Sequence, residues 1–197
     1  MDTNTRALEL AKALKRIERF NRVDYYDPYP YQQKFHKTGS EANQRLLMAA
    51  NRIGKSYSGA AEMSYHLTGL YPKWWEGRRY DKPITAWAGG VSNETTRDIV
   101  QYELLGSPDD PDAFGSGAIP KSKIIKTERK PGVPNAKSVA LVQHVSGGNS
   151  SLHFKAYEMG VDKWQGRSVD CIWLDEEPSR ELYSQAVTRT LDRKGMV

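Results

Sequence analysis

The stretch at residues 49–56 constrains the fold of this chain more than any other, and it reads Ala-Ala-Asn-Arg-Ile-Gly-Lys-Ser. It follows the phosphate-loop pattern Gly-x4-Gly-Lys-Ser/Thr except at its first position, where Ala49 replaces glycine. The apolar run at 45–50 predicts a short strand before it, and residues 55–68 predict a helix after it. Strand, loop and helix in that order form a phosphate-binding unit of α/β proteins. The alternative is an ordinary turn before a helix.

Each polar residue of this loop has a defined role if the loop binds a nucleotide. Gly54 lets the backbone approach a phosphate closely, and the N–H groups at a helix N-terminus favour an anion. Lys55 is predicted to pair with β- and γ-phosphate oxygens, and the Ser56 hydroxyl to bind Mg²⁺. Arg52 is predicted to be an arginine finger at the γ-phosphate; the alternative is a surface arginine in a loop. The loop residues predicted to contact ATP are Ala50, Asn51, Arg52, Ile53, Gly54, Lys55, Ser56 and Tyr57.

A second motif lies at 169–176, where a mostly apolar segment ends in two carboxylates, Asp175 and Glu176. Such a segment is typical of a central parallel strand, and ligands bind at the carboxyl ends of these strands. Asp175 is therefore predicted to hold Mg²⁺, directly or through water, and Glu176 to polarise the water that attacks the γ-phosphate. The alternative is a strand that ends in a solvated acidic turn. Together with the 49–56 loop, the acidic pair favours a hydrolase over a small-molecule kinase.

Three aromatic segments carry weaker signals. Tyr29 and Gln32 are predicted to hold adenine, because an amide can pair with the edge of adenine and an aromatic ring can stack on it. The alternative is a proline-rich loop that leads into a helix. Residues 163–167 either line a channel or contact nucleotide, or they form a turn with a buried tryptophan. Residues 74–79 interleave aromatics with cations, as nucleic-acid sites do, but a loop folded on its own aromatics is favoured.

The composition excludes several classes of protein. The 197 residues include a single cysteine, Cys171, which excludes an internal disulfide, and four scattered histidines, which disfavour a zinc site. No apolar run is long enough for a transmembrane helix, and the N-terminus has no signal-peptide pattern. The formal net charge of +5 permits a polyanionic partner without identifying one.

The remaining pattern predicts one α/β domain behind an N-terminal helical arm. Residues 4–21 predict a helix, so the chain is divided into an arm at 1–22 and a domain at 23–197. The helix is expected to pack on the domain by one face; the alternative is an arm that docks onto another protein. Further strands are predicted at 84–90, 138–145, 152–157 and 169–175. Further helices are predicted at 93–105 and 179–191, and flexible excursions at 106–121 and 130–137. This order predicts a mostly parallel central sheet with helices on both faces and an antiparallel hairpin.

Taken together, these motifs resemble the large subunit of tailed-phage terminases, the ATP-driven motors that package DNA into procapsids. The resembling segments are 29–32, 46–56, 66–72, 164–166, 175–178 and 182–190. The resemblance implies a P-loop NTPase core of the ASCE, RecA-like type. It assigns Gln32 to adenine, Arg52 to the arginine of the loop and Lys55 to phosphate. It assigns Ser56 and Asp175 to the metal and Glu176 to the catalytic base.

The resemblance also implies partners and a setting. The implied partners are double-stranded DNA, a portal protein and a small terminase subunit, with self-association into a ring on the procapsid portal. The implied location is the cytoplasm of the infected bacterium, transiently at the procapsid portal and not in the mature virion, with no membrane partner. Members of the family continue into a coupling motif and a nuclease domain, whereas this sequence stops at residue 197. The expectation is therefore an N-terminal ATPase portion without nuclease activity.

Two other functions stay open from the sequence. A helicase-like nucleic-acid translocase shares the glutamine, the phosphate loop and the acidic pair, but it needs a second lobe or a subunit interface with its own arginines. A non-catalytic scaffold or DNA-binding module keeps the shape of the loop without binding Mg-ATP. Strand separation tests the first function, and a thermal shift with Mg-ATP tests the second.

Overall fold

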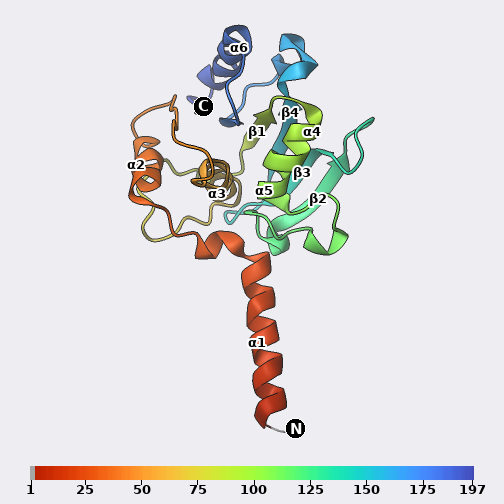
Figure 1. Cartoon of the computed structure of the whole chain (residues 1–197). Helices are drawn as coiled ribbons and strands as arrows, with labels where there is room; N and C mark the ends of the chain where they lie inside the picture. Colours follow the sequence, from red (N-terminus) through yellow and green to blue (C-terminus); the bar gives the residue numbers. More distant parts are fainter. Residues whose placement is uncertain (1–2) are drawn as a thin grey trace.

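The computed structural model describes residues 3–197 (Figure 1). Its helices are α1 (Thr3–Phe20), α2 (Pro30–Thr38), α3 (Lys55–Thr68), α4 (Asn93–Thr95), α5 (Tyr102–Leu105) and α6 (Arg180–Leu191). A π-helical turn, Thr96–Gln101, joins α4 to α5, so that residues 93–105 form one helical run. Its strands are β1 (Thr85–Gly90), β2 (Ile124–Arg129), β3 (Lys137–Gln143), β4 (Asn149–Ala156) and β5 (Cys171–Leu174). The helices predicted at 55–68, 93–105 and 179–191 are therefore confirmed.

The sheet is mixed, and the prediction of a mostly parallel sheet is wrong. Its strand order is β2-β3-β4-β1-β5; β1 runs parallel to β4 and β5, whereas β2·β3 and β3·β4 are antiparallel. The cause is the short connections at 130–136 and 144–148, because a tight turn can join only antiparallel neighbours. Gly147 and Gly148 take positive φ, 95° and 77°, in the second turn. The flexible excursion expected at 130–137 is instead the turn between β2 and β3, at 130–136, and the first residue of β3, Lys137.

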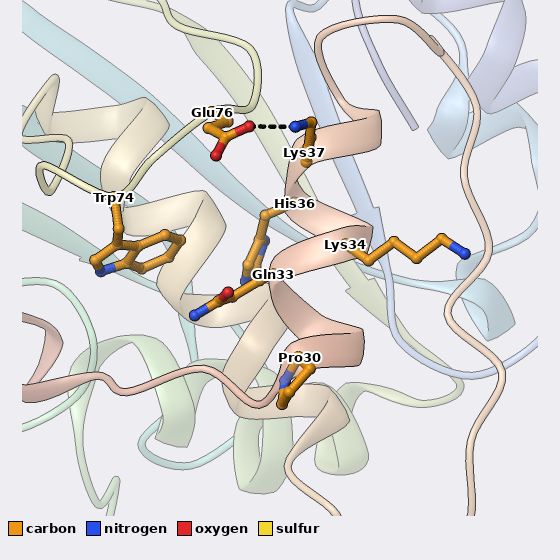
Figure 2. A pocket seen from close by; sticks show the side chains of 7 residues that line it. All are labelled: Pro30, Gln33, Lys34, His36, Lys37, Trp74 and Glu76. Atoms are coloured by element: carbon orange, nitrogen blue, oxygen red, sulfur yellow. Dashed lines mark ion pairs between the residues drawn. The ribbon is translucent and has the colours of Figure 1, made fainter.

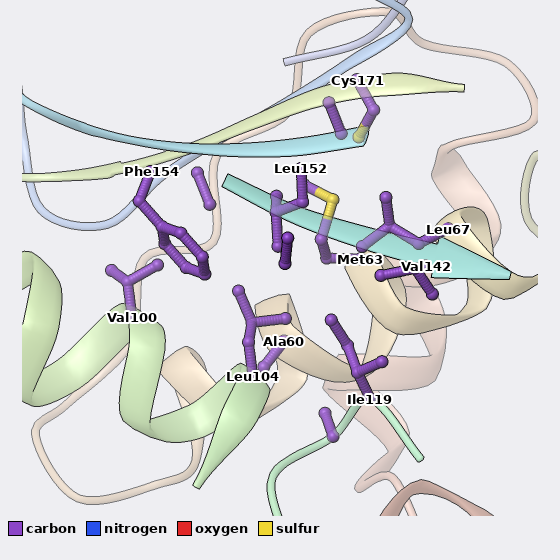
Figure 3. Packing of buried hydrophobic residues seen from close by; sticks show 14 of the residues in the cluster. Ala60, Met63, Leu67, Val100, Leu104, Ile119, Val142, Leu152, Phe154 and Cys171 are labelled. Carbon is purple, nitrogen blue, oxygen red and sulfur yellow. The ribbon is translucent and has the colours of Figure 1, made fainter. Parts of the chain in front are cut away.

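Helices cover both faces of the sheet, as predicted. On one face, α3 and the 93–105 run pack on the strands around buried side chains that include Met63, Leu104 and Phe154 (Figure 3). On the other face, α6 contributes Leu182 to a second cluster that contains Trp87 of β1. Side chains alternate between the two faces along each strand, so one short strand serves both cores. Burial on both faces fixes the register of β1 between β4 and β5.

The segment at 45–50, predicted as the strand before the phosphate loop, is not a strand. Leu46 and Met48 are 78% and 80% exposed. Within residues 3–197, only its start pairs with another segment: Arg45 N donates to Val197 O at 3.0 Å, and Val197 N donates to Asn43 O, just before the segment, at 2.8 Å. An extended segment becomes a strand only where neighbours satisfy its N–H and C=O groups along its length. The apolar run at 46–50 has no such ladder within the described residues, so its sequence pattern is not enough.

Helix α1 projects away from the rest of the molecule (Figure 1). Its apolar side chains Leu8, Leu10, Leu14 and Ile17 are each more than half exposed, at 52–63%. The expectation that this helix packs on the domain by one face is therefore wrong, and docking of the arm onto another protein stays a prediction. Residues 1–2 of the predicted arm lie outside the described residues. None of the helices in residues 3–197 combines the length and the apolar character that a membrane span requires.

A buried carboxylate ties the segment before the 49–56 loop to the two helices beside it. Glu62 of α3 is 5% exposed and forms an ion pair with Arg45. His36 Nδ1 of α2 donates to Glu62 at 2.6 Å, and His66 Nε2 donates to it at 3.3 Å. Burial opposes the charge, but the histidine hydrogen bonds and the Arg45 guanidinium hold the pKa of Glu62 well below its usual range. The network therefore contains a charged carboxylate that needs all of its partners.

Replacing Arg45 with methionine should destabilise the protein by about 3–5 kcal/mol, because it leaves a buried carboxylate without its cation. Urea unfolding at pH 7 measures this loss. The matched control is Lys37→Met, which breaks the exposed Lys37–Glu76 pair and should change stability little. Equal effects of the two substitutions would contradict a structural role for the buried network.

The same carboxylate predicts that stability depends on pH. Because the pKa of Glu62 is lower in the folded state than the unfolded value of about 4.3, the charged carboxylate stabilises the protein above that pH. This contribution is lost as the pH falls further, through the folded-state pKa.

Candidate functional site

The 49–56 loop ends at the N-terminus of α3. Arg52 and Gly54 both take left-handed backbone conformations, with φ of 62° and 81°. Gly54 is the N-cap of α3, and no side chain caps the helix. The N–H groups of the first turn, at residues 55–57, have no intrahelical acceptor, and none donates to another backbone carbonyl within residues 3–197. These donors and the helix dipole together favour an anion at this position.

The lysine of the loop folds back onto the loop itself. Lys55 Nζ donates to the carbonyl oxygens of Ala49 at 2.6 Å and of Ala50 at 2.8 Å. The ammonium group is therefore held among backbone carbonyls on the loop that leads into α3. Its four-carbon stem is flexible, so the group can exchange these carbonyls for phosphate oxygens without a change in the backbone.

The loop and the acidic strand meet at one contact. Ser56 Oγ donates to Asp175 Oδ1 at 3.1 Å, although the two residues are 119 positions apart. Asp175 directly follows β5, and its N–H donates to Gly89 O at 2.8 Å, which extends the parallel pairing of β5 with β1. Burial raises the pKa of Asp175, the Ser56 hydrogen bond and the Lys55 charge lower it, and the neighbouring Glu176 raises it. The predicted metal ligands are thus brought together, and their role as ligands stays a prediction.

Glu176 occupies a tight turn beside this contact. It is exposed, and its φ of 67° is unusual for a residue with a side chain. The hydroxyl of Tyr157 lies 2.9 Å from Asp175 O and 3.1 Å from Glu176 O. Sequence reasoning missed Tyr157. The available signal was its place as the last residue of a predicted strand, at the edge of the sheet where ligands gather.

A second group near the site was also missed from the sequence. The ring of Tyr57 stacks against Arg22, whose guanidinium carbon lies 4.0 Å from the ring centroid; the predicted contact of Tyr57 with ATP stays a prediction. Arg22 also pairs with Glu103 at 3.4 Å. Burial raises the pKa of Glu103, Arg22 lowers it, and the charge of Asp175 raises it again. No sequence pattern connects residues 22, 57 and 103, because only the fold brings them together.

The predicted adenine-binding residues lie on and beside the first turn of α2. Gln32 is 2% exposed; its Oε1 accepts from Tyr29 N at 2.8 Å, and its Nε2 donates to Gly54 O at 3.2 Å. The ring of Tyr31 stacks with that of Tyr29, with centroids 5.9 Å apart, and its hydroxyl donates to Ile53 O. Gln32 and Tyr31 therefore fasten α2 to the 49–56 loop. A contact of Gln32 with adenine stays a prediction, and it would use the second N–H and the second lone pair of the amide.

A separate pocket of about 230 Å³ borders α2 (Figure 2). Its lining includes Gln33 and Lys34 of α2, Trp74, and the exposed Lys37–Glu76 ion pair. The lining shares no residue with the 49–56 loop or with the acidic turn, so this pocket is not the predicted phosphate site.

The two other aromatic segments are structural. Trp75 is 4% exposed, and its Nε1 donates to Arg78 O at 2.9 Å, as expected for a loop folded on its own aromatics. Trp164 is fully buried, and its Nε1 donates to Ala156 O at 3.3 Å. The 163–167 segment is therefore a turn with a buried tryptophan. A contact of the charged side chains of this segment with nucleotide, or with a channel, stays a prediction.

The metal ligands predicted from sequence are one hydroxyl and one carboxylate. In the described part of the chain, no group of three or more His, Cys, Asp or Glu side chains is placed to hold a metal ion. Magnesium in nucleotide sites takes one or two protein ligands and completes its shell with phosphate oxygens and water. Ser56 and Asp175, at 3.1 Å, fit that type of site.

Comparisons with known proteins agree on one family. The family model "Terminase large subunit, T4likevirus-type, N-terminal" matches residues 46–196. The large terminase subunit of Salmonella phage P22 is 36% identical over 203 residues, which covers 93% of this chain and 41% of that protein. This chain therefore spans less than half the length of that curated relative. No solved structure matches the chain. The family match over most of the chain and the P22 relative show that the chain belongs to the terminase large-subunit family of tailed phages and corresponds to its N-terminal portion.

Proposed function

We propose that this chain is the Mg²⁺-dependent ATP hydrolase domain of a viral DNA-packaging motor. The observation that carries the proposal is the hydrogen bond of 3.1 Å between Ser56 and Asp175, which joins the phosphate loop to the acidic strand. In P-loop NTPases a loop Ser or Thr and a strand-end Asp hold the metal beside the phosphates. A P-loop NTPase core of the RecA-like type is part of this proposal.

The residues of the loop fit the phosphates of ATP. The first turn of α3 offers N–H donors without acceptors, and Gly54 keeps side-chain atoms away from them. Lys55 transfers its hydrogen bonds from the carbonyls of Ala49 and Ala50 to β- and γ-phosphate oxygens. Arg52 is exposed in the same loop and adds a second positive charge at the γ-phosphate. The other residues of this stretch, Ala50, Asn51 and Ile53, contribute backbone contacts.

The acidic turn supplies the hydrolytic chemistry. Asp175 and Ser56 hold Mg²⁺, which neutralises charge on the phosphate oxygens when it is bound. Glu176 accepts a hydrogen bond from the attacking water and orients it toward the γ-phosphate. Tyr29, 61% exposed, stacks on the adenine base, while Gln32 pairs with the edge of the base. All of these side chains come from the loop, the start of α2 and the end of β5.

The packaging role rests on the family. The name of the P22 relative is that of a terminase large subunit, and such subunits act in DNA packaging. The proposed substrate is double-stranded DNA, driven into a procapsid by a ring of subunits, with a portal protein and a small terminase subunit as partners. The proposed location is the cytoplasm of the infected bacterium, at the portal. The nuclease activity of the family is not proposed for residues 1–197.

Addition of Mg-ATP should raise the melting temperature of this chain by about 5–10 °C at a concentration near 100 times the dissociation constant, because binding at that excess adds about 2.7 kcal/mol of stability. Differential scanning fluorimetry measures the shift, and phosphate release measures turnover. The controls are ATP with EDTA and the Lys55→Ala variant, both of which should show a smaller shift.

The same experiment separates the proposed function from its alternatives. A chain that shows no shift with Mg-ATP is a scaffold or DNA-binding module that keeps only the shape of the loop. A shift with turnover supports the ATPase, and a strand-displacement assay on the intact protein then separates a packaging motor from a helicase. A motor moves duplex DNA without unwinding it, so strand displacement would contradict the packaging role.

A further inference from the structure

The turn that carries Glu176 is unfavourable by itself. Glu176 has φ of 67°, a left-handed conformation that brings Cβ close to the following carbonyl oxygen. The direction of its Cα–Cβ bond, and hence the reach of its carboxylate, depends on this backbone conformation. A residue other than glycine stays in this conformation only where surrounding contacts hold it there.

One side chain makes such contacts. Tyr157 begins the turn that follows β4, and the ends of β4, β1 and β5 lie side by side in the sheet. Its hydroxyl reaches across the end of β1 to the end of β5, where it lies 2.9 Å from Asp175 O and 3.1 Å from Glu176 O. It also lies 3.4 Å from Gly89 O of β1. A single phenol thus contacts both carbonyls that flank the left-handed residue.

The Tyr157 ring is itself held firmly. It packs against Trp164, with ring centroids 5.8 Å apart, and Trp164 is fully buried. Burial, and then the charges of Asp175 and Glu176, raise the pKa of the Tyr157 phenol. The neutral phenol carries a single O–H, which the two carbonyls share as acceptors. Packing of the ring thus fixes the position of the hydroxyl that contacts the acidic turn.

We propose that Tyr157 is a positioning residue: its hydroxyl holds the Asp175–Glu176 turn in the left-handed conformation that aims the Glu176 carboxylate. The expected effect of Tyr157 on catalysis rests on the proposed ATPase function. Its expected effect on the backbone of the turn rests on the contacts alone. Tyr157 does not touch the substrate in this role. Its loss should impair the step that needs Glu176 more than the binding of ATP to the loop.

The first test uses the crystal structure of the Tyr157→Phe chain without nucleotide. Loss of the hydroxyl should let the turn relax, so that Glu176 moves to a negative φ and its side chain changes direction. A Glu176 backbone that keeps its positive φ in this variant would overturn the proposal. Because this readout needs neither ATP nor turnover, it stands even if the chain proves to be no ATPase.

The second test measures kinetics of the same variant against Tyr80→Phe. Tyr80 is a matched control, since its hydroxyl donates to Asp170 O at 2.6 Å, on the residue that precedes β5. Tyr157→Phe should lower kcat for ATP by about 10–100-fold with KM changed less than about threefold, because a misaimed catalytic group loses rate and not binding. Tyr80→Phe should keep kcat within about twofold of the wild type.

Parallel losses of kcat in the two variants, or an unchanged kcat in Tyr157→Phe, would overturn the kinetic part of the proposal. Absence of turnover in the wild-type chain would reject the proposed function instead, and the backbone test would then decide the role of Tyr157.

Discussion

Replacement of Arg52 with alanine should slow ATP hydrolysis by about 10³–10⁵-fold, the range that arginine fingers contribute in related reactions. Arg52 is exposed in the loop that leads into α3, where a guanidinium can reach charge that develops on the γ-phosphate. Binding of Mg-ATP should weaken much less, because Lys55 and the N–H groups of α3 remain. Phosphate release gives kcat, and the thermal shift with Mg-ATP reports binding.

Because the backbone at Arg52 is left-handed, a glycine variant is needed beside the alanine variant. Its φ of 62° is unfavourable for alanine and easily adopted by glycine. Arg52→Gly therefore removes the guanidinium without adding strain, and it should lose as much rate as Arg52→Ala. Arg52→Lys keeps the charge but not the planar fork, so its rate should fall between that of the wild type and that of the alanine variant. A glycine variant that hydrolyses ATP normally would contradict the finger role and attribute the effect to strain.

Replacement of Glu176 with glutamine should lower kcat by about 10²–10⁴-fold, the usual contribution of a positioned general base. Glutamine has nearly the same shape, so the left-handed turn and the contacts of Tyr157 with its carbonyls are preserved. Mg-ATP should still bind, because Ser56, Asp175 and the loop are unchanged. The thermal shift should therefore match that of the wild type while phosphate release falls.

The neighbouring carboxylate provides the control for Glu176. Glu177 is also exposed and follows directly in the chain, so Glu177→Gln removes the same charge from the same turn. It should keep kcat within about threefold of the wild type, because surface substitutions outside a site change little. Equal losses in the two variants would indicate a general effect of charge, and an unchanged Glu176→Gln would show that another group activates the water.

Local sequence patterns predicted the parts of the site that are built from consecutive residues. The loop at 49–56 leads into a helix that begins at Lys55, and the apolar segment before Asp175 forms β5. Such patterns are reliable because helix propensity, glycine freedom and apolar runs act over a few residues. They also predicted helices on both faces of the sheet.

The same reasoning failed where an element depends on a distant partner. Residues 45–50 have the pattern of a strand but lack a ladder, and β2 is a charged edge strand that no apolar pattern marks. The sequence also did not indicate that the Gln32 amide fastens α2 to Gly54. Each of these outcomes is set by hydrogen-bond partners that lie outside the local segment.

The sequence by itself therefore determined the chemical inventory of this protein: a loop with the phosphate-binding pattern and an internal arginine, a strand that ends in two carboxylates, and a resemblance to the family that combines them. Only the tertiary structure decided that Ser56 meets Asp175, that the Tyr157 hydroxyl reaches the carbonyls of Asp175 and Glu176, and that the sheet is mixed. The physical reason is that residue type and spacing fix which groups are present. Distances across the sheet, by contrast, depend on how buried faces pack together.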